Sequence, residues 1–137
     1  MNPQRRTLLT GLAAAGATTL VAPWAQAQGY PEQPVKWVVP YPAGGGTDVI
    51  ARTLSEAMRP ALGQAIVIDN RPGASTNIGA DLVAKSKPDG YTIMSADNAV
   101  LAFNEYLFGK LPFNPEKDFS YIGAIGRFPL AIVVHPD

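Results

Sequence analysis

A strand, a glycine loop and a helix follow one another directly in residues 35–62, and this order constrains the fold more than any other feature. Residues 35–40 are apolar and β-branched, which predicts a buried strand. Three glycines at 44–46 follow, and then a helix that Thr47 or Asp48 is expected to cap. Glycine backbones can approach a ligand closely, and a helix start presents unpaired N–H groups. The order therefore predicts a cradle for a carboxylate or a phosphate.

The rest of the chain repeats the alternation of strand and helix. The first helix is expected to reach Leu62, before Gly63, with Pro60 ending its regular part early. Further strands are expected at residues 65–68, 91–95, 121–125 and 130–134, and further helices from Ile78 to before Pro88 and from Asp97 and Asn98 to Phe108. Strands separated by helices indicate βαβ units, so the predicted class is α/β with a mainly parallel sheet flanked by helices.

Polar loops follow the first three predicted strands, at residues 41–48, 69–77 and 96–98, and each leads into a helix. In a parallel sheet the carboxyl ends of the strands meet at one edge, and ligands bind beyond that edge. We therefore expect three helix starts to converge on one anion.

Several known motifs do not fit these loops. A phosphate-binding P-loop needs a lysine after its glycines, where this chain has Thr47 and Asp48. A dinucleotide fingerprint needs a glycine where Val49 stands, and residues 73–77 lack the second glycine of a nucleophile elbow. A tight turn without a ligand remains an alternative for the glycine loop. A helix cap remains the alternative role for Asp97.

Residues 1–27 have the features of a secretory signal peptide. Arg5 and Arg6 precede an apolar run at 8–22, and Ala25-Gln26-Ala27 resembles a cleavage site. The Arg-Arg-x-Leu-Leu pattern is similar to a twin-arginine export signal, and Sec export stays open. A membrane anchor is the alternative, although the glycines, threonines and proline of this run make a poor membrane span. The mature chain is expected to begin near Gln28.

Composition narrows the chemistry of the mature part. The 137 residues include no cysteine and one histidine, which excludes disulfides and thiolate metal sites and leaves no histidine-based triad. Without Arg5 and Arg6, residues 28–137 carry two more acidic than basic side chains, so a nucleic-acid partner is not expected. About 110 residues can bury one modest core, which is enough for one domain.

Four spaced motifs in the mature part resemble one protein family. They lie at residues 41–48 (Tyr-Pro-Ala-Gly-Gly-Gly-Thr-Asp), 70–80, 87–92 and 111–119. They are similar to the signature of the substrate-binding proteins of tripartite tricarboxylate transporters, also called the Bug family, and the resemblance extends over residues 34–137. It implies a periplasmic solute-binding protein with a periplasmic-binding-protein-like fold of type II. Ligands of this family are small carboxylates, such as di- and tricarboxylates, acidic amino acids or aromatic acids.

The resemblance also implies a ligand site. In the family, loops after the strands hold a ligand carboxylate through backbone amides, hydroxyls and ordered water. Carried onto this chain, the implied ligand-binding residues are Tyr41, Gly45, Gly46, Thr47, Asp48, Ser75, Asn77, Ala96, Asp97 and Asn98. The third loop departs from the pattern, because members often have a small or hydroxyl residue and then histidine in place of Asp97-Asn98. The added acid is expected to alter ligand preference or to disfavour a second carboxylate nearby.

Family members have two domains around a cleft and are longer than this chain. The resemblance therefore implies that residues 28–137 are the N-terminal α/β domain, truncated near the hinge, and that they supply one wall of the cleft. The implied partners are a carboxylate and the membrane subunits of a tripartite transporter. We expect a monomer without cofactor, metal or nucleic acid. Two alternatives stay open: an α/β enzyme that uses the same cradle, and a truncated remnant that binds nothing.

Overall fold

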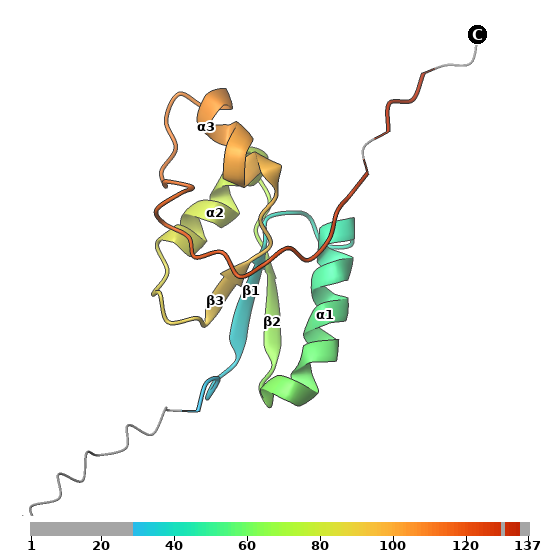
Figure 1. Cartoon of the computed structure of the whole chain (residues 1–137), viewed down its shortest axis with the longest axis vertical. Helices are drawn as coiled ribbons and strands as arrows, with labels where there is room; N and C mark the ends of the chain where they lie inside the picture. The colour runs from blue at the N-terminus through green and yellow to red at the C-terminus, as the bar shows by residue number, and fades with distance from the viewer. Residues whose placement is uncertain (1–28, 130, 135–137) are drawn as a thin grey trace, which may run out of the picture. The chain divides into compact units, whose positions relative to one another are not determined.

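The computed structural model describes residues 29–129 and 131–134 (Figure 1). The chain divides into two units, Met1–Tyr30 and Pro31–Asp137, and the fold described here is that of the second. The predicted signal peptide, residues 1–27, lies in the first unit, and its residues are outside the described ranges. None of the helices in the described ranges has the length and apolarity needed to cross a membrane.

The second unit is built around a three-stranded parallel sheet with the strand order β2-β1-β3. In the register of the sheet, Trp37 of the central strand pairs with Ile68 on one side and Ile93 on the other. The elements are, in chain order, β1 (Val35–Val39), α1 (Gly46–Leu62), β2 (Ile66–Asn70), η2 (Ala74–Thr76), α2 (Asn77–Ala84), β3 (Thr92–Met94), η3 (Ala99–Phe103) and α3 (Asn104–Leu107). The predicted α/β class and the parallel sheet are therefore confirmed.

Helices α1 and α2 cover opposite faces of the sheet (Figure 1). Trp37 and Val39 of β1 pack against Ala51 of α1. Ala80 of α2 belongs to a second cluster, against which Met94 of β3 packs. Because successive side chains of a strand point to opposite faces, Ile93 joins the first cluster while its neighbour Met94 joins the second. The result is an α/β/α arrangement whose strand ends stay clear for loops.

Helix α1 differs from its prediction at the start and in its last turn. Its N-cap is Gly45, so neither Thr47 nor Asp48 is the cap, and Asp48 is instead the third helical residue. From that position its side chain accepts a hydrogen bond from the N–H group of Gly44, the residue before the N-cap, and this bond joins the loop to the first turn of the helix. Pro60 lies inside the helix and does not end it early. Helix α1 ends, as predicted, before Gly63.

The chain after β3 differs most from its prediction. The predicted third helix is a π-helix, η3, continued by the short α-helix α3. The predicted strand at 121–125 is absent, and residues 131–134 form no strand either, while Leu130 lies outside the described residues. Ile122 is 85% exposed and Ile132 is 96% exposed. An apolar β-branched segment becomes a strand only when its backbone pairs with that of a neighbour, and neither segment pairs with the three-stranded sheet of the described residues.

Candidate functional site

The three loops that follow the strands leave the same edge of the sheet. Because β1, β2 and β3 are parallel, their carboxyl ends lie together. The backbone N–H of Arg71 donates to the carbonyl of Val39 (2.8 Å), and that of Ser95 donates to the carbonyl of Val38 (3.1 Å). The second and third loops therefore start beside the first, as the sequence predicted.

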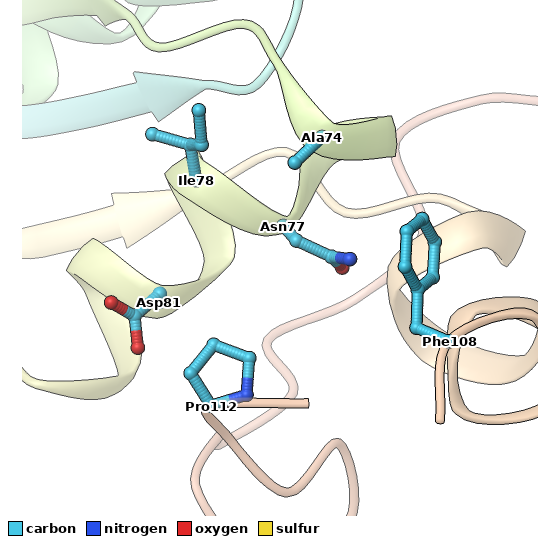
Figure 2. Close-up of a pocket in the computed structure, with 6 residues that line it drawn as sticks. All are labelled: Ala74, Asn77, Ile78, Asp81, Phe108 and Pro112. Carbon is cyan, nitrogen blue, oxygen red and sulfur yellow. The ribbon is translucent and has the colours of Figure 1, made fainter. Parts of the chain in front are cut away.

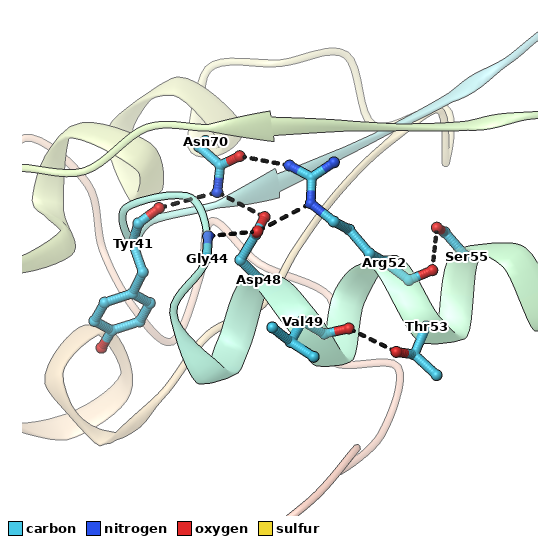
Figure 3. A network of polar contacts seen from close by, with 8 residues as sticks. All are labelled: Tyr41, Gly44, Asp48, Val49, Arg52, Thr53, Ser55 and Asn70. Atoms are coloured by element: carbon cyan, nitrogen blue, oxygen red, sulfur yellow. Dashed lines mark hydrogen bonds and ion pairs between the residues drawn. The ribbon is translucent and has the colours of Figure 1, made fainter.

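The first loop is held by a network of hydrogen bonds and an ion pair around Asp48 (Figure 3). Asp48 is 2% exposed. Its carboxylate accepts hydrogen bonds from the backbone of Gly44 (2.8 Å), from Nε of Arg52 (2.9 Å) and from Nδ2 of Asn70 (3.0 Å). Asn70 also donates to the carbonyl of Tyr41 (3.0 Å) and accepts from Arg52 (3.1 Å). Gly44 is therefore tied directly to the buried carboxylate, and Tyr41 is tied to it through Asn70.

The same contacts keep Asp48 ionised. The hydrogen bond from Arg52 lowers the pKa of its carboxyl group well below the ordinary value, and the bonds from the Gly44 backbone and from Asn70 lower it further. Both carboxylate oxygens of Asp48 are already bonded to protein donors. The structure therefore gives Asp48 a role in holding the loop, and a direct ligand contact through its side chain stays a prediction.

The glycines of the first loop leave the start of α1 accessible. Gly44 has a φ of +84°, a conformation that favours glycine. Gly45 and Gly46 are exposed, and the first N–H groups of the helix have no acceptor within the helix. A Cβ atom at Gly46 would lie 3.5 Å from Cε1 of Phe128, an ordinary van der Waals contact, so the Phe128 ring lies next to the helix start. Thr47, which follows, is half-buried. This exposed helix start has the geometry that the predicted anion cradle requires, and the binding of an anion there stays a prediction.

The second loop turns through an unusual backbone. Gly73 has a φ of 123°, and Ala74, Ser75 and Thr76 have φ values of 45°, 50° and 75°. Residues other than glycine rarely adopt this left-handed backbone conformation, because it costs about 1–2 kcal/mol for each residue. Other contacts must therefore hold the turn. Asn104 provides them: its Nδ2 donates to the Ser75 carbonyl (2.7 Å) and to Oδ1 of Asn77 (2.7 Å).

The third loop, residues 96–98, is exposed and holds two of the predicted polar groups. The Tyr41 hydroxyl donates a hydrogen bond to Asp97 Oδ2. Asp97 Oδ1 accepts from the backbone of Ala99 (3.0 Å) and of Val100 (3.4 Å), so Asp97 also caps the helical turn, the role weighed for it from the sequence. Burial, and then the bond to Asp97, raises the pKa of Tyr41, which keeps its hydroxyl protonated as a donor.

The described contacts tie the three loops to one another in pairs. Asn70, at the end of β2, binds the first loop, and Tyr41 joins the first loop to Asp97 in the third. Asn104, in the helix after the third loop, binds the second loop. The predicted site residues therefore belong to one connected edge, with Ser75 exposed and Asn77 buried in the second loop and with Ala96 and Asn98 exposed in the third.

Three residues of this edge were missed by the sequence prediction. Arg52 lies four residues after Asp48, a spacing that favours an ion pair on one helix face, so its role was open to prediction. Asn70 opens one of the quoted motifs but was not singled out. Nothing local marks Asn104, whose partners lie 27 and 29 residues earlier in the chain.

An open pocket of about 280 Å³ lies beside the second loop. It is lined by residues of α2, of the turn before it and of the segment after α3, namely Ala74, Asn77, Ile78, Asp81, Phe108 and Pro112 (Figure 2). Most of these side chains are apolar, and the Asn77 amide projects toward the space between α2 and Phe108. Within residues 29–129 and 131–134, no group of three or more His, Cys, Asp or Glu side chains is arranged to hold a metal ion.

Comparison of the sequence with known proteins defines the family. Residues 50–137 match the tripartite tricarboxylate transporter family receptor. The chain is 44% identical over 115 residues to a UPF0065 protein of Bordetella bronchiseptica, with 84% of this chain and 34% of that protein covered. It is 40% identical over 121 residues to BugT of Bordetella pertussis, with 88% and 37% covered. The chain belongs to the tripartite tricarboxylate transporter receptor family, and it spans about a third of the length of these relatives.

Solved structures confirm the fold. A periplasmic transporter aligns with a TM-score of 0.60 and 39% identity, over 63% of this chain and 29% of that one. A protein of R. palustris with adipate aligns at 0.61 and 38%, over 64% and 29%. MatC from Rhodopseudomonas palustris with bound malate aligns at 0.57 and 39%, over 66% and 31%. The parallel sheet with flanking helices is therefore part of a periplasmic-binding-protein domain.

Proposed function

We propose that this chain is the solute-binding part of a tripartite transporter in the periplasm and that it binds a small carboxylate at the carboxyl edge of its sheet. The observation that supports this most is the start of α1, where glycines expose unpaired N–H groups. A ligand carboxylate there would accept hydrogen bonds from the backbone of Gly46 and Thr47 and from the Thr47 hydroxyl. The positive end of the helix dipole would favour its charge.

The network beneath the loop supports the proposal because it removes an electrostatic objection. A bare carboxylate at Asp48 would repel an anionic ligand. Arg52 lies 2.9 Å from it and pairs its charge, so the cradle carries no unpaired negative charge from Asp48. The carboxylates named with the two Rhodopseudomonas structures, adipate and malate, are of the proposed ligand class.

Export and delivery to membrane subunits follow from the same proposal. The twin-arginine-like signal at 1–27 supports transfer to the periplasm, and the family supports delivery of the ligand to a membrane partner. Other parts of a longer protein would close over the ligand, since a small ligand usually needs most of its surface buried. We therefore expect residues 28–137, as one wall of the cleft, to bind carboxylates weakly and saturably. The carboxylate should not be consumed.

A thermal-shift screen of the full chain with malate, adipate and other small carboxylates tests the proposal. At least one acid should raise Tm saturably. Gly46→Val should abolish that rise with little loss of expression, because the added side chain would occupy the exposed space at the helix start in which the ligand carboxylate is proposed to bind. Gly123→Val is the matched control, since a Cβ atom at Gly123 has no neighbour within 4 Å. No shift with any acid, at concentrations far above micromolar, would contradict the proposal.

A further inference from the structure

The buried side chain of Asn104 shares its Nδ2 atom between the two halves of the second loop. Asn104 is fully buried at the start of α3. We propose that Asn104 is a positioning residue, which holds the left-handed turn at 74–76 and makes the Asn77 amide a hydrogen-bond donor toward the ligand. The proposal rests on the carboxylate binding proposed above and gives the second loop its part in that binding.

Hydrogen-bond polarity fixes the direction of both amides. The Ser75 carbonyl can only accept, so the Asn104 atom 2.7 Å from it must be the nitrogen. The same nitrogen lies 2.7 Å from the Asn77 side chain, and two donors cannot bond to each other. The Asn77 atom that faces Asn104 is therefore its oxygen. Its Nδ2 group must point the other way, as a donor of the kind that a carboxylate binds.

The direction of this donor matches the open space beside it. Asn77 lines the pocket next to the second loop, and its amide projects into the space between α2 and Phe108 (Figure 2). Asn77 is also the first residue of α2, and its own backbone N–H group donates to the Ala74 carbonyl. Its side-chain amide is therefore the donor that Asn77 has left for a ligand.

Asn104 is not explained by packing alone. Its Oδ1 atom is buried and has no hydrogen-bond partner within the described residues, which is costly for an amide that serves only to fill space. Val100, four residues earlier, is equally buried but apolar, and it belongs to the second hydrophobic cluster. Its two hydrogen bonds, one to the strained turn and one to Asn77, explain why an amide is needed at this position.

Substitution of Asn104 tests the proposal on the full chain. Asn104→Leu keeps the branched shape of the side chain, with bulkier methyl groups, and removes the donor, so the backbone couplings that report φ at Ser75 and Thr76 should change in NMR spectra. The affinity for malate, used as the probe in calorimetry, should fall about tenfold. Val100→Ala is the matched control, because it removes equally buried atoms without touching the turn. It should lower Tm and leave the malate affinity within about twofold.

Asn77→Asp separates the two roles and does not depend on Asn104→Leu being folded. The aspartate still accepts from Asn104, so the couplings at Ser75 and Thr76 should stay unchanged, while the lost donor and the added charge should abolish malate binding. Wild-type affinity in either Asn104→Leu or Asn77→Asp, or an equal loss in Val100→Ala, would overturn the proposal. Absence of binding by malate and by every other acid of the screen in the wild type would overturn the proposed function instead, and the couplings in Asn104→Leu would still report whether Asn104 holds the turn.

Discussion

The first and second loops of the sheet edge are held in place in opposite ways. The first is tied by a charged group close in sequence, since Asp48 binds Gly44 and Arg52, each four residues away. The second is tied by a neutral amide, Asn104, from 29 residues away. The left-handed backbone falls on a glycine in the first loop and on Ala74, Ser75 and Thr76 in the second.

The difference shows two routes to the same end. The first loop is fixed mainly by its own sequence, and the long-range contact of Asn70 adds to a turn that glycine already permits. The second loop adopts a conformation that its sequence disfavours, so it depends on the packing of α3. We therefore expect the first loop to lose its conformation when the charge of Asp48 is removed. The second loop should lose its conformation when the distant Asn104 side chain is changed.

Loss of the Asp48 carboxylate should have the largest effect. Asp48→Ala leaves Arg52, Asn70 and the Gly44 backbone without their shared acceptor, and Tm should fall by about 8 °C or more. Circular dichroism during heating measures this. Glu56→Ala is the control in the same helix, because the exposed pair of Glu56 and Arg59 contributes little. Equal falls in both variants would show that the network does not hold the first loop.

Acid should destabilise the first loop by protonating the same carboxylate, that of Asp48. The folded state lowers the pKa of Asp48, so its contribution is complete above the unfolded value of about 4 and is lost as the pH falls below it. Urea unfolding of the wild type between pH 7 and pH 3 should therefore show stability declining at the acid end. Asp48→Asn should show a smaller decline over that interval, and an identical pH profile in both proteins would exclude Asp48 as a source.

Backbone substitutions should have opposite signs in the two loops. Gly44→Ala should cost about 1 kcal/mol, because alanine disfavours a φ of +84°. Ser75→Gly should gain about 0.5 kcal/mol, because relief of the strain exceeds the added freedom of the unfolded chain. Chemical denaturation measures both values. A loss in both variants would mean that the second loop is not strained.

A substitution in the third loop should have the smallest effect, and it should change which ligand the site prefers. Asp97→Asn keeps an acceptor for Tyr41 and for the cap of η3 but removes an exposed charge. Binding of adipate, which carries two carboxylates, should strengthen by about threefold, and binding of propionate should not change. Calorimetry with both acids distinguishes this from a general effect on the site, which would alter the two affinities equally.

The fold could be predicted from the sequence where the signals are local. Residues 35–62 contain a strand pattern, glycines and a helix pattern in direct succession, and β1 and α1 form there. The helix start was misplaced, because a side chain in the first turn can bond backward as well as cap. The strand predicted at 121–125 was wrong, because a strand needs a partner that the segment's own residues do not specify.

The site could be predicted only in part for the same reason. Tyr41, Asp48 and Asp97 stood out as polar residues next to strand ends, where a parallel sheet places ligands. Asn104 lies in an apolar helical stretch, and its role depends on a turn formed far away in sequence. Contacts of this kind become visible only when the folded positions of both segments are known.

The central claim is that the first and second loops form one carboxylate site, and an amide NMR titration of the full chain with malate tests it most directly. The N–H signals of Gly45, Gly46 and Thr47 and those of Thr76, Asn77 and Ile78 should shift together and give one Kd. Shifts confined to one loop, or two different Kd values, would contradict a single shared site.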